Sequence, residues 1–263
     1  MIAVLYAAIV FGATFLGAFV GLGGGVIIKP LFDLAGFDTV DTVNFLSACA
    51  VFAMSVASTI KYRREKRPTD KKIILLCACG AVAGGILGNV LFDVVLEAAG
   101  RPEIVKSIQA AILAVLLIAS VCYINLKNPK TLHVTHPAGI AAAGLMLGVT
   151  SSFLGVGGGP INVAAMVLFF SITVKDAAVY SVAVIFFTQL SKLVTIFIDN
   201  QFAPYSERLW LLLLLVPCAV LGGILGARYN KKADGKKISK VFSVAVSAIA
   251  LVNIYNAVSI FFS

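Results

Sequence analysis

The stretch Gly155-Val156-Gly157-Gly158-Gly159-Pro160 lies in the middle of an uncharged run that extends from Pro137 to Val174. A matching stretch, Gly21-Leu22-Gly23-Gly24-Gly25, lies 134 positions earlier. In a helix interior, glycine costs about 1 kcal/mol and proline about 3 kcal/mol relative to alanine. In a membrane such breaks are tolerated only where the backbone is buried in protein or lines a polar cavity. Two breaks at equivalent places in two halves of a chain therefore predict the binding site of a transporter.

Close packing between helices is a simpler explanation of these glycines. Gly17, Gly21 and Gly25 have the small-xxx-small spacing that lets two membrane helices approach each other closely. Under this alternative the glycine clusters hold a bundle together and bind nothing. Both explanations place the clusters inside a membrane protein, and they differ in what a substitution of one glycine would do.

The composition is that of a protein with several membrane spans. Of the 263 residues, 60% are hydrophobic and only 13% are charged, whereas soluble domains average about 25% charged residues. A span needs about 20 apolar residues, and we count eight main hydrophobic segments, of which the sixth contains Ser181 and Lys192. The uncharged runs cover residues 2–28, 42–60, 73–92, 107–126, 137–174, 209–227 and 241–263.

The net charge of +9 is explained by cytoplasmic loops, in which Lys and Arg are favoured. No interleaving of aromatic and basic residues and no zinc spacing indicates binding to nucleic acid. The five cysteines all lie inside hydrophobic runs, and we interpret them as small apolar residues rather than as a disulfide framework or a metal site. We therefore expect neither nucleic acid nor a metal ion as a partner.

The chain also repeats itself. Several residues recur at an offset of 134, and a second glycine motif recurs at an offset of 138. Two motifs in the same order with nearly equal spacing predict an internal duplication, with a first transmembrane repeat at 1–130 and a second at 131–263 in one integral membrane domain. The matched positions are Ser47 with Ser181, Phe52 with Phe186, and Gly-Gly-Ile-Leu-Gly at 84–88 with the same sequence at 222–226.

The positive charges predict how the repeats lie in the membrane. The clusters at 61–72 and 228–240 should both be cytoplasmic, yet the first precedes the Gly-Gly-Ile-Leu-Gly span and the second follows it. The halves are therefore predicted to be inverted, which requires an odd number of crossings in each half. The run 137–174 would be about 57 Å long as one helix, against a hydrocarbon core of about 30 Å, so it should fold at its glycines into two arms of about 18 residues.

The predicted fold is thus an all-α polytopic membrane protein made of two inverted repeats. Each repeat has a glycine-broken helical hairpin followed by three transmembrane helices, which gives up to ten crossings. Both chain ends then lie outside the cell and every basic loop lies inside. The lengths of the segments leave open whether each hairpin crosses fully or is re-entrant.

The hairpin tips carry the predicted binding site. Second arms that start near Val26 and Pro160 would direct their N-terminal N–H groups and positive dipole ends towards the tips, and helix N-termini bind anions. Lys192 is the most informative charge; it either faces the anion or extends along its helix to the interface. We expect no catalytic or metal-binding residue. The candidate substrate-binding residues are Gly23, Gly24, Gly25, Gly157, Gly158, Gly159, Asn162, Ser47, Ser181, Gln189 and Lys192.

The two Gly-x-Gly-Gly-Gly motifs, the serine-containing helix after each and the duplicated Gly-Gly-Ile-Leu-Gly span resemble the TauE/SafE family of sulfite and organosulfonate exporters. The resemblance covers nearly the whole chain. It implies a membrane transporter for sulfur-containing anions such as sulfite or sulfoacetate, without fixing substrate or direction. Gln189 and Lys192 depart from the small and hydroxyl residues that the family carries on this helix, which leaves the exact substrate open.

We therefore expect a multi-pass transporter of the inner cell membrane, without a cofactor, that exports a small sulfur-containing anion bound near the midplane. Its partners would be the anion and the lipid bilayer, and a homo-oligomer is left open. The alternatives are a carboxylate or other small-anion transporter or importer on the same scaffold, and a membrane subunit that transports nothing. No nucleophile–base pair or phosphate loop indicates an enzyme, and no carboxylate lies deep in a span to relay protons.

Overall fold

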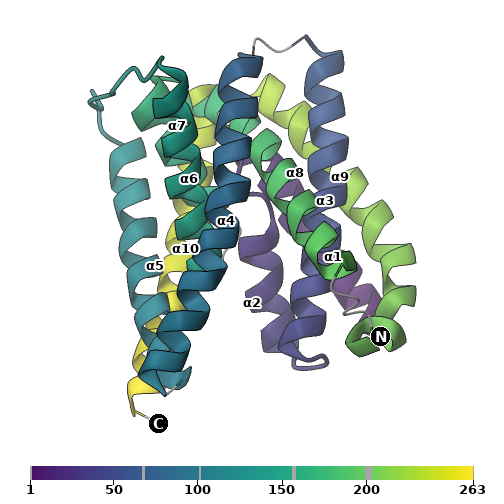
Figure 1. Ribbon diagram of the computed structural model, residues 1–263. Helices are drawn as coiled ribbons and strands as arrows, with labels where there is room; N and C mark the ends of the chain where they lie inside the picture. Colours follow the sequence, from purple (N-terminus) through teal and green to yellow (C-terminus); the bar gives the residue numbers. More distant parts are fainter. Residues whose placement is uncertain (1, 67–68, 101, 156–157, 199–202, 263) are drawn as a thin grey trace.

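The computed structural model describes residues 2–66, 69–100, 102–155, 158–198 and 203–262 (Figure 1). Over these residues the chain forms ten α-helices and one 3-10 helix, and no strand. The all-helical fold class is therefore confirmed. The elements are α1 (Ile2–Val20), α2 (Gly25–Ala35), α3 (Val40–Arg64), α4 (Lys71–Ala99), α5 (Pro102–Ile124), α6 (Pro137–Phe153), α7 (Gly159–Phe170), α8 (Val174–Ile198), η1 (Ala203–Leu211), α9 (Leu212–Lys232) and α10 (Gly235–Phe262).

Seven helices in the described ranges are long and apolar enough to cross a membrane. The other three belong to the two hairpins: α2 has 11 residues, α6 has 17 and α7 has 12. At 1.5 Å per residue, α2 and α7 are about 16 and 18 Å long, which is little more than half of a core of about 30 Å. Each hairpin therefore combines a long first arm with a short second arm.

For the run 137–174, the expectation of two arms of about 18 residues fits α6, which has 17 residues, but is wrong for α7, which has 12. α7 stops at Phe170 because Ser171 adopts a left-handed conformation with φ 57°, and α2 stops before Gly36, which has φ 69°. The uncharged run 137–174 therefore includes the non-helical residues 154, 155, 158 and 171–173. The length of an apolar run thus overestimates the length of the helix inside it.

Glycines at equivalent positions shape both hairpin tips. Gly21 and Gly24 have φ values of 84° and 74°, and Gly155 and Gly158, 134 positions later, have φ values of 66° and 79°. Only glycine adopts this left-handed conformation at little cost. The shared backbone geometry is what the predicted duplication requires, because the same turn is made at the same two positions of each motif.

The repeated glycine helix of the first half, α4, packs along the first hairpin arm of the second half, α6. The approach is so close that a Cβ at Gly84 would overlap the carbonyl oxygen of Leu145, and a Cβ at Gly148 would overlap that of Ala81. Small residues on both helices thus allow backbone-to-backbone contact.

The corresponding contact is made by α9, the glycine helix of the second half, which packs along α1. A Cβ at Gly226 would overlap the carbonyl oxygen of Phe15. Each half therefore covers the hairpin of the other half. α3 and α8 also pack against each other, and there the matched residues Phe52 and Phe186 stack with ring centroids 5.6 Å apart and an interplanar angle of 19°.

The two basic clusters lie at the same end of the bundle. Glu65, at the end of α3, is 3.2 Å from Lys61 Nζ and 3.8 Å from Lys231 Nζ, at the end of α9. The Asp70 N–H, just before α4, donates to the Tyr180 hydroxyl near the start of α8 (2.6 Å). The end of α3 therefore lies at the same end of the bundle as the start of α8. Since α3 and α8 carry the matched residues of the two halves, inverted halves require them to run in opposite directions in this way. The inverted repeat and its orientation in a membrane stay predictions.

The opposite end is held by a different set of charges. Tyr6 near the start of α1 donates to Asp38 Oδ2 (2.8 Å), and Arg208 forms an ion pair with Asp38 (2.6 Å). In Figure 1, α1 begins and α10 ends on this lower side, whereas α3 ends and α4 begins on the upper side.

This arrangement predicts that the C-terminus is extracytoplasmic and that both basic loops are cytoplasmic. Reporter fusions after Asn125, after Lys236 and at Ser263 measure it. The first two fusions should report a cytoplasmic location, and the third should not. A cytoplasmic reading at both Lys236 and Ser263 would contradict the topology.

The contact between α4 and α6 predicts that Gly84→Ala lowers the thermal midpoint of the detergent-extracted protein. The added methyl group has to displace the backbone at Leu145, and overpacking of this kind costs about 1–3 kcal/mol. Gly12→Ala in α1 is the matched control, because nothing lies within 4 Å of the position of its Cβ. Equal midpoints for the two variants would refute the close contact.

Candidate anion-binding site

A cavity of about 400 Å³ lies between the hairpin tips and the helices α3, α4, α6 and α8. Twelve of its described lining residues are polar or charged, and none of them is acidic. Both halves of the chain contribute to it. The polar and charged side chains that line it are Lys29, Asn44, Ser47, Asn89, Ser151, Ser152, Asn162, Thr188, Gln189, Ser191, Lys192 and Thr195.

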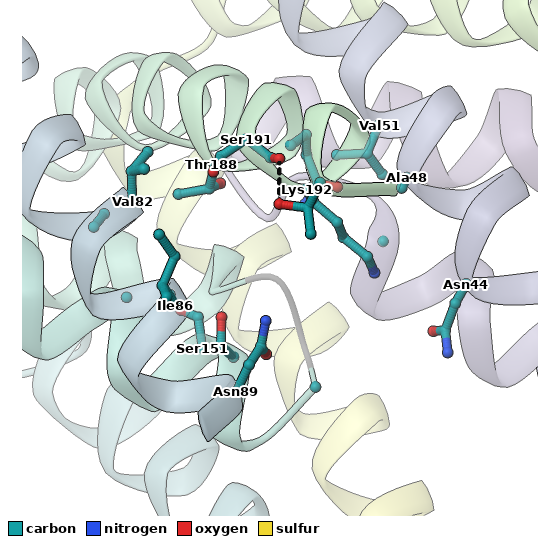
Figure 2. Close-up of a pocket in the computed structure, with 18 of the residues that line it drawn as sticks. Asn44, Ala48, Val51, Val82, Ile86, Asn89, Ser151, Thr188, Ser191 and Lys192 are labelled. Atoms are coloured by element: carbon teal, nitrogen blue, oxygen red, sulfur yellow. Dashed lines mark hydrogen bonds between the residues drawn. The ribbon is translucent and has the colours of Figure 1, made fainter. Parts of the chain in front are cut away.

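Lys192 extends from α8 into this cavity. Figure 2 shows its side chain directed between Asn89 and Ser151 on one side and Asn44 on the other. Within the described part of the chain, its ammonium group makes no hydrogen bond or ion pair. A cation inside a membrane protein is stabilised when it pairs with an opposite charge, so this position suits an anionic ligand better than extension to the lipid interface.

Lys29 supplies a second ammonium group from the other half of the chain. It lies on α2, and its Nζ donates a hydrogen bond to the carbonyl oxygen of Gly155 in the second hairpin tip (2.7 Å). The bond links the two tips and holds this charge at the cavity wall. Sequence analysis missed Lys29. Its position in the sequence could have indicated it, because Lys29 lies four residues after Gly25 and the two residues therefore share one face of α2.

Asn162 is the buried polar residue closest to the second tip. Only 3% of its surface is exposed, and its Oδ1 has no hydrogen-bond partner among the described residues. A buried polar atom without a partner costs about 1–3 kcal/mol. The amide can present either its oxygen or its NH₂ group to the cavity after a half-turn about its last bond, so a bound ligand could satisfy it.

Several further polar groups in the cavity have no partner in the described ranges. The hydroxyls of Thr188 and Thr195 donate to the carbonyl oxygens of Ile185 and Ser191 in their own helix, so they are occupied as donors. By contrast, no hydrogen bond is found for the following side chains: Asn44, Ser47, Asn89, Ser151, Ser152 and Gln189. All of these groups can donate hydrogen bonds to the oxygen atoms of an anion.

The structure brings together part of the predicted site. Gly25, Ser47, Asn162, Gln189 and Lys192 all line the cavity. Gly25 is the first residue of α2, so the positive end of that helix faces the same space. Sequence analysis did not select Asn89 or Ser151. Asn89 directly follows the repeated Gly-Gly-Ile-Leu-Gly stretch, and Ser151 precedes the second tip, so both were polar interruptions of apolar runs.

Other predicted residues have packing contacts instead. A Cβ at Gly159 would overlap the carbonyl oxygen of Leu22, so the two tips touch through their backbones. Gly23 packs against the Ile185 side chain, and Gly24 packs against the backbone of α1. The Ser181 hydroxyl donates to the carbonyl oxygen of Gly21 (2.8 Å). A role for these residues in binding stays a prediction.

Gly158 does not line the cavity itself, but it contacts two residues that do. It is left-handed, and an added Cβ would overlap the Ser151 hydroxyl and lie 3.0 Å from Asn162 Oδ1. It therefore gives the side chains of two cavity residues the room that they need. Gly157 lies outside the described residues.

A family model for the sulfite exporter TauE/SafE matches residues 6–252. The chain belongs to this family. The probable membrane transporter protein YunE of Bacillus subtilis (strain 168) is 26% identical over 277 residues, which cover 92% of this chain and 93% of that protein. The probable membrane transporter protein MamO of Magnetospirillum gryphiswaldense is 25% identical over 269 residues, which cover 89% of this chain and 42% of that longer protein.

Membership of the TauE/SafE family, together with seven apolar helices of spanning length, identifies a multi-pass membrane transporter. The family resemblance and the membrane location expected from the sequence are thereby confirmed. The family is one of transporters rather than of enzymes, in agreement with the sequence interpretation.

For this transporter, Lys192→Ala is predicted to weaken anion binding roughly tenfold or more, because a hydrogen bond to a charged group contributes about 1.5–3 kcal/mol. Lys192→Arg should retain part of the activity, because the charge survives while the shape changes. Half-saturating substrate concentrations in proteoliposomes measure both effects. Lys236→Ala, at the start of α10 and away from the cavity, is the control. Unchanged anion binding by the Lys192→Ala variant would contradict this role and favour the alternative, in which the Lys192 side chain extends to the membrane interface.

Proposed function

We propose that this protein exports a small sulfur-containing anion, such as sulfite or an organosulfonate. One observation carries the proposal: the cavity between the hairpin tips holds two ammonium groups, from Lys29 and Lys192, and none of its described lining residues is acidic. The family description, sulfite exporter, names the kind of anion.

The chemistry of the cavity favours an oxyanion over a cation or a neutral solute. Two positive charges in a partly desolvated space repel each other, and an anion offsets that repulsion. The amide and hydroxyl groups of Asn89, Ser151 and Gln189 provide donors for several oxygen atoms. A volume of about 400 Å³ has room for a small organic acid together with water.

The membrane potential is sufficient to drive export. An anion that leaves a cell with a negative interior gains about 2.3 kcal/mol per charge for each 100 mV. Transport in this direction therefore needs no coupling ion. An importer of the same anion would have to work against this potential and would need a second driving force.

Flux of radiolabelled sulfite in proteoliposomes tests the proposal, with taurine, sulfoacetate and acetate as competitors. Sulfite flux should exceed that of empty liposomes, should saturate, and should increase when the potential is positive on the receiving side. Stronger competition by acetate than by the sulfur compounds would favour the carboxylate alternative. The absence of flux for every tested anion would refute the proposed function.

Asn162→Leu separates binding from folding. Because Asn162 Oδ1 has no partner among the described residues, leucine leaves no other group unsatisfied, and the thermal midpoint should be unchanged or raised. Transport should fall severalfold, because the cavity loses an amide that faces the ligand. A loss of stability in proportion to the loss of flux would show that Asn162 is a structural residue.

A further inference from the structure

A second cavity, of about 840 Å³, lies between α3, α4 and α8. It is on the side of the bundle where α3 ends and α4 begins, the end that carries both basic clusters. Its walls are mostly apolar, with Ile60, Ile74 and Phe187 among the lining residues. Three exposed cations, Arg63, Lys66 and Lys71, lie at its rim.

The two cavities follow each other along the same three helices. On α3, the polar cavity is lined by residues between 44 and 51, and the second cavity by residues from 56 onwards. On α8, the division falls between Phe187 and Thr188, and on α4 it falls between Leu75 and Ala81. No residue lines both cavities, so a common wall crosses the bundle at this level.

Aromatic rings stand at that wall. Phe52 lies on α3 between the two sets of lining residues and stacks on Phe186 of α8, with ring centroids 5.6 Å apart. Phe187 meets Phe186 edge-on, with centroids 4.9 Å apart and an interplanar angle of 77°. Phe52 and Phe186 are also matched positions of the two repeats, so the barrier lies where equivalent helices of the two halves meet.

We propose that the two cavities are the two ends of one anion path and that the stacked pair Phe52–Phe186 is the closed gate between them. This proposal rests on the proposed function. An apolar constriction excludes water and ions by dewetting, so an anion in the polar cavity cannot pass while the rings are stacked. Because one ring belongs to each half, a displacement of α3 relative to α8 opens the path.

The rim of the second cavity has the charge that an anion entrance needs. Arg63, Lys66 and Lys71 raise the local concentration of anions at the mouth, by an attraction that salt weakens. The walls behind them are mostly apolar, as expected on the closed side of the gate. A lipid with an anionic headgroup is the competing occupant, since its acyl chain would fit such walls.

The gate is tested with Phe186→Ala and Phe52→Ala, and Phe169→Ala serves as the control, because Phe169 lines neither cavity. In proteoliposomes, the two gate variants should raise the passive leak of chloride severalfold, and their sulfite flux should no longer saturate. Phe186→Leu keeps apolar bulk at the constriction and should preserve the barrier. Unchanged leak and unchanged saturation in both alanine variants would overturn the proposal.

Thiol labelling provides a readout that does not depend on transport. In a variant with the five native cysteines replaced by serine, Asn44→Cys marks the polar cavity and Val56→Cys marks the second cavity. A membrane-impermeant maleimide added on the extracytoplasmic side should label position 44 only, and Phe186→Ala should add labelling at position 56. Equal labelling of position 56 with and without Phe186 would overturn the gate.

The occupant of the second cavity is decided by Arg63→Gln combined with Lys71→Gln. The double variant should raise the half-saturating sulfite concentration severalfold from the cytoplasmic side only, and more at low salt. An unchanged value, with a lipid that co-purifies with the wild type and is lost from the double variant, would assign the cavity to lipid and overturn the proposal. Absence of wild-type flux for any anion, with labelling as expected, would instead refute the proposed function and leave the path for another solute.

Discussion

The fold depends on a backbone contact between the two hairpin tips. Gly159 lies against the carbonyl oxygen of Leu22 so closely that no other residue fits there. Left-handed glycines on both sides of this contact turn the chain back on itself, and the Lys29 ammonium and the Ser181 hydroxyl each bond a carbonyl oxygen of the other half's tip. These contacts bring the start of α2 and the Asn162 amide to one cavity.

The packing of each half against the hairpin of the other half determines which helices line the polar cavity. α4 covers α6 and α9 covers α1, so neither hairpin is buried by its own half. The polar cavity is consequently built from both halves of the chain, with α2, α3 and α4 on one side and α6, α7 and α8 on the other. Any relative movement of the halves changes the distance between Lys29 and Lys192, and therefore the strength with which an anion is held.

Much of the fold could be predicted from the sequence, because its strongest signals are local. The apolar runs gave the spans, and the glycine clusters gave the positions of both tips. The length of α7 could not be predicted, because Ser171 ends this helix without a change in hydrophobicity. At the site, Lys192 and Asn162 stood out as polar residues in apolar runs. Asn89 interrupts an apolar run in the same way and Lys29 follows the first tip, but their proximity to the cavity depends on which helices of the two halves pack together.

The asymmetry of the polar cavity has an evolutionary consequence. If the two halves arose by inverted duplication, as the sequence predicts, the ancestral dimer of two identical halves would have had two identical cavities. Here Lys29, Asn162 and Lys192 correspond, at the offset of 134, to Val163, Ile28 and Ser58. None of the three has a charged or amide counterpart. On that prediction, the two halves diverged after fusion, and the ammonium and amide groups lie at positions whose counterparts in the other half are apolar or small.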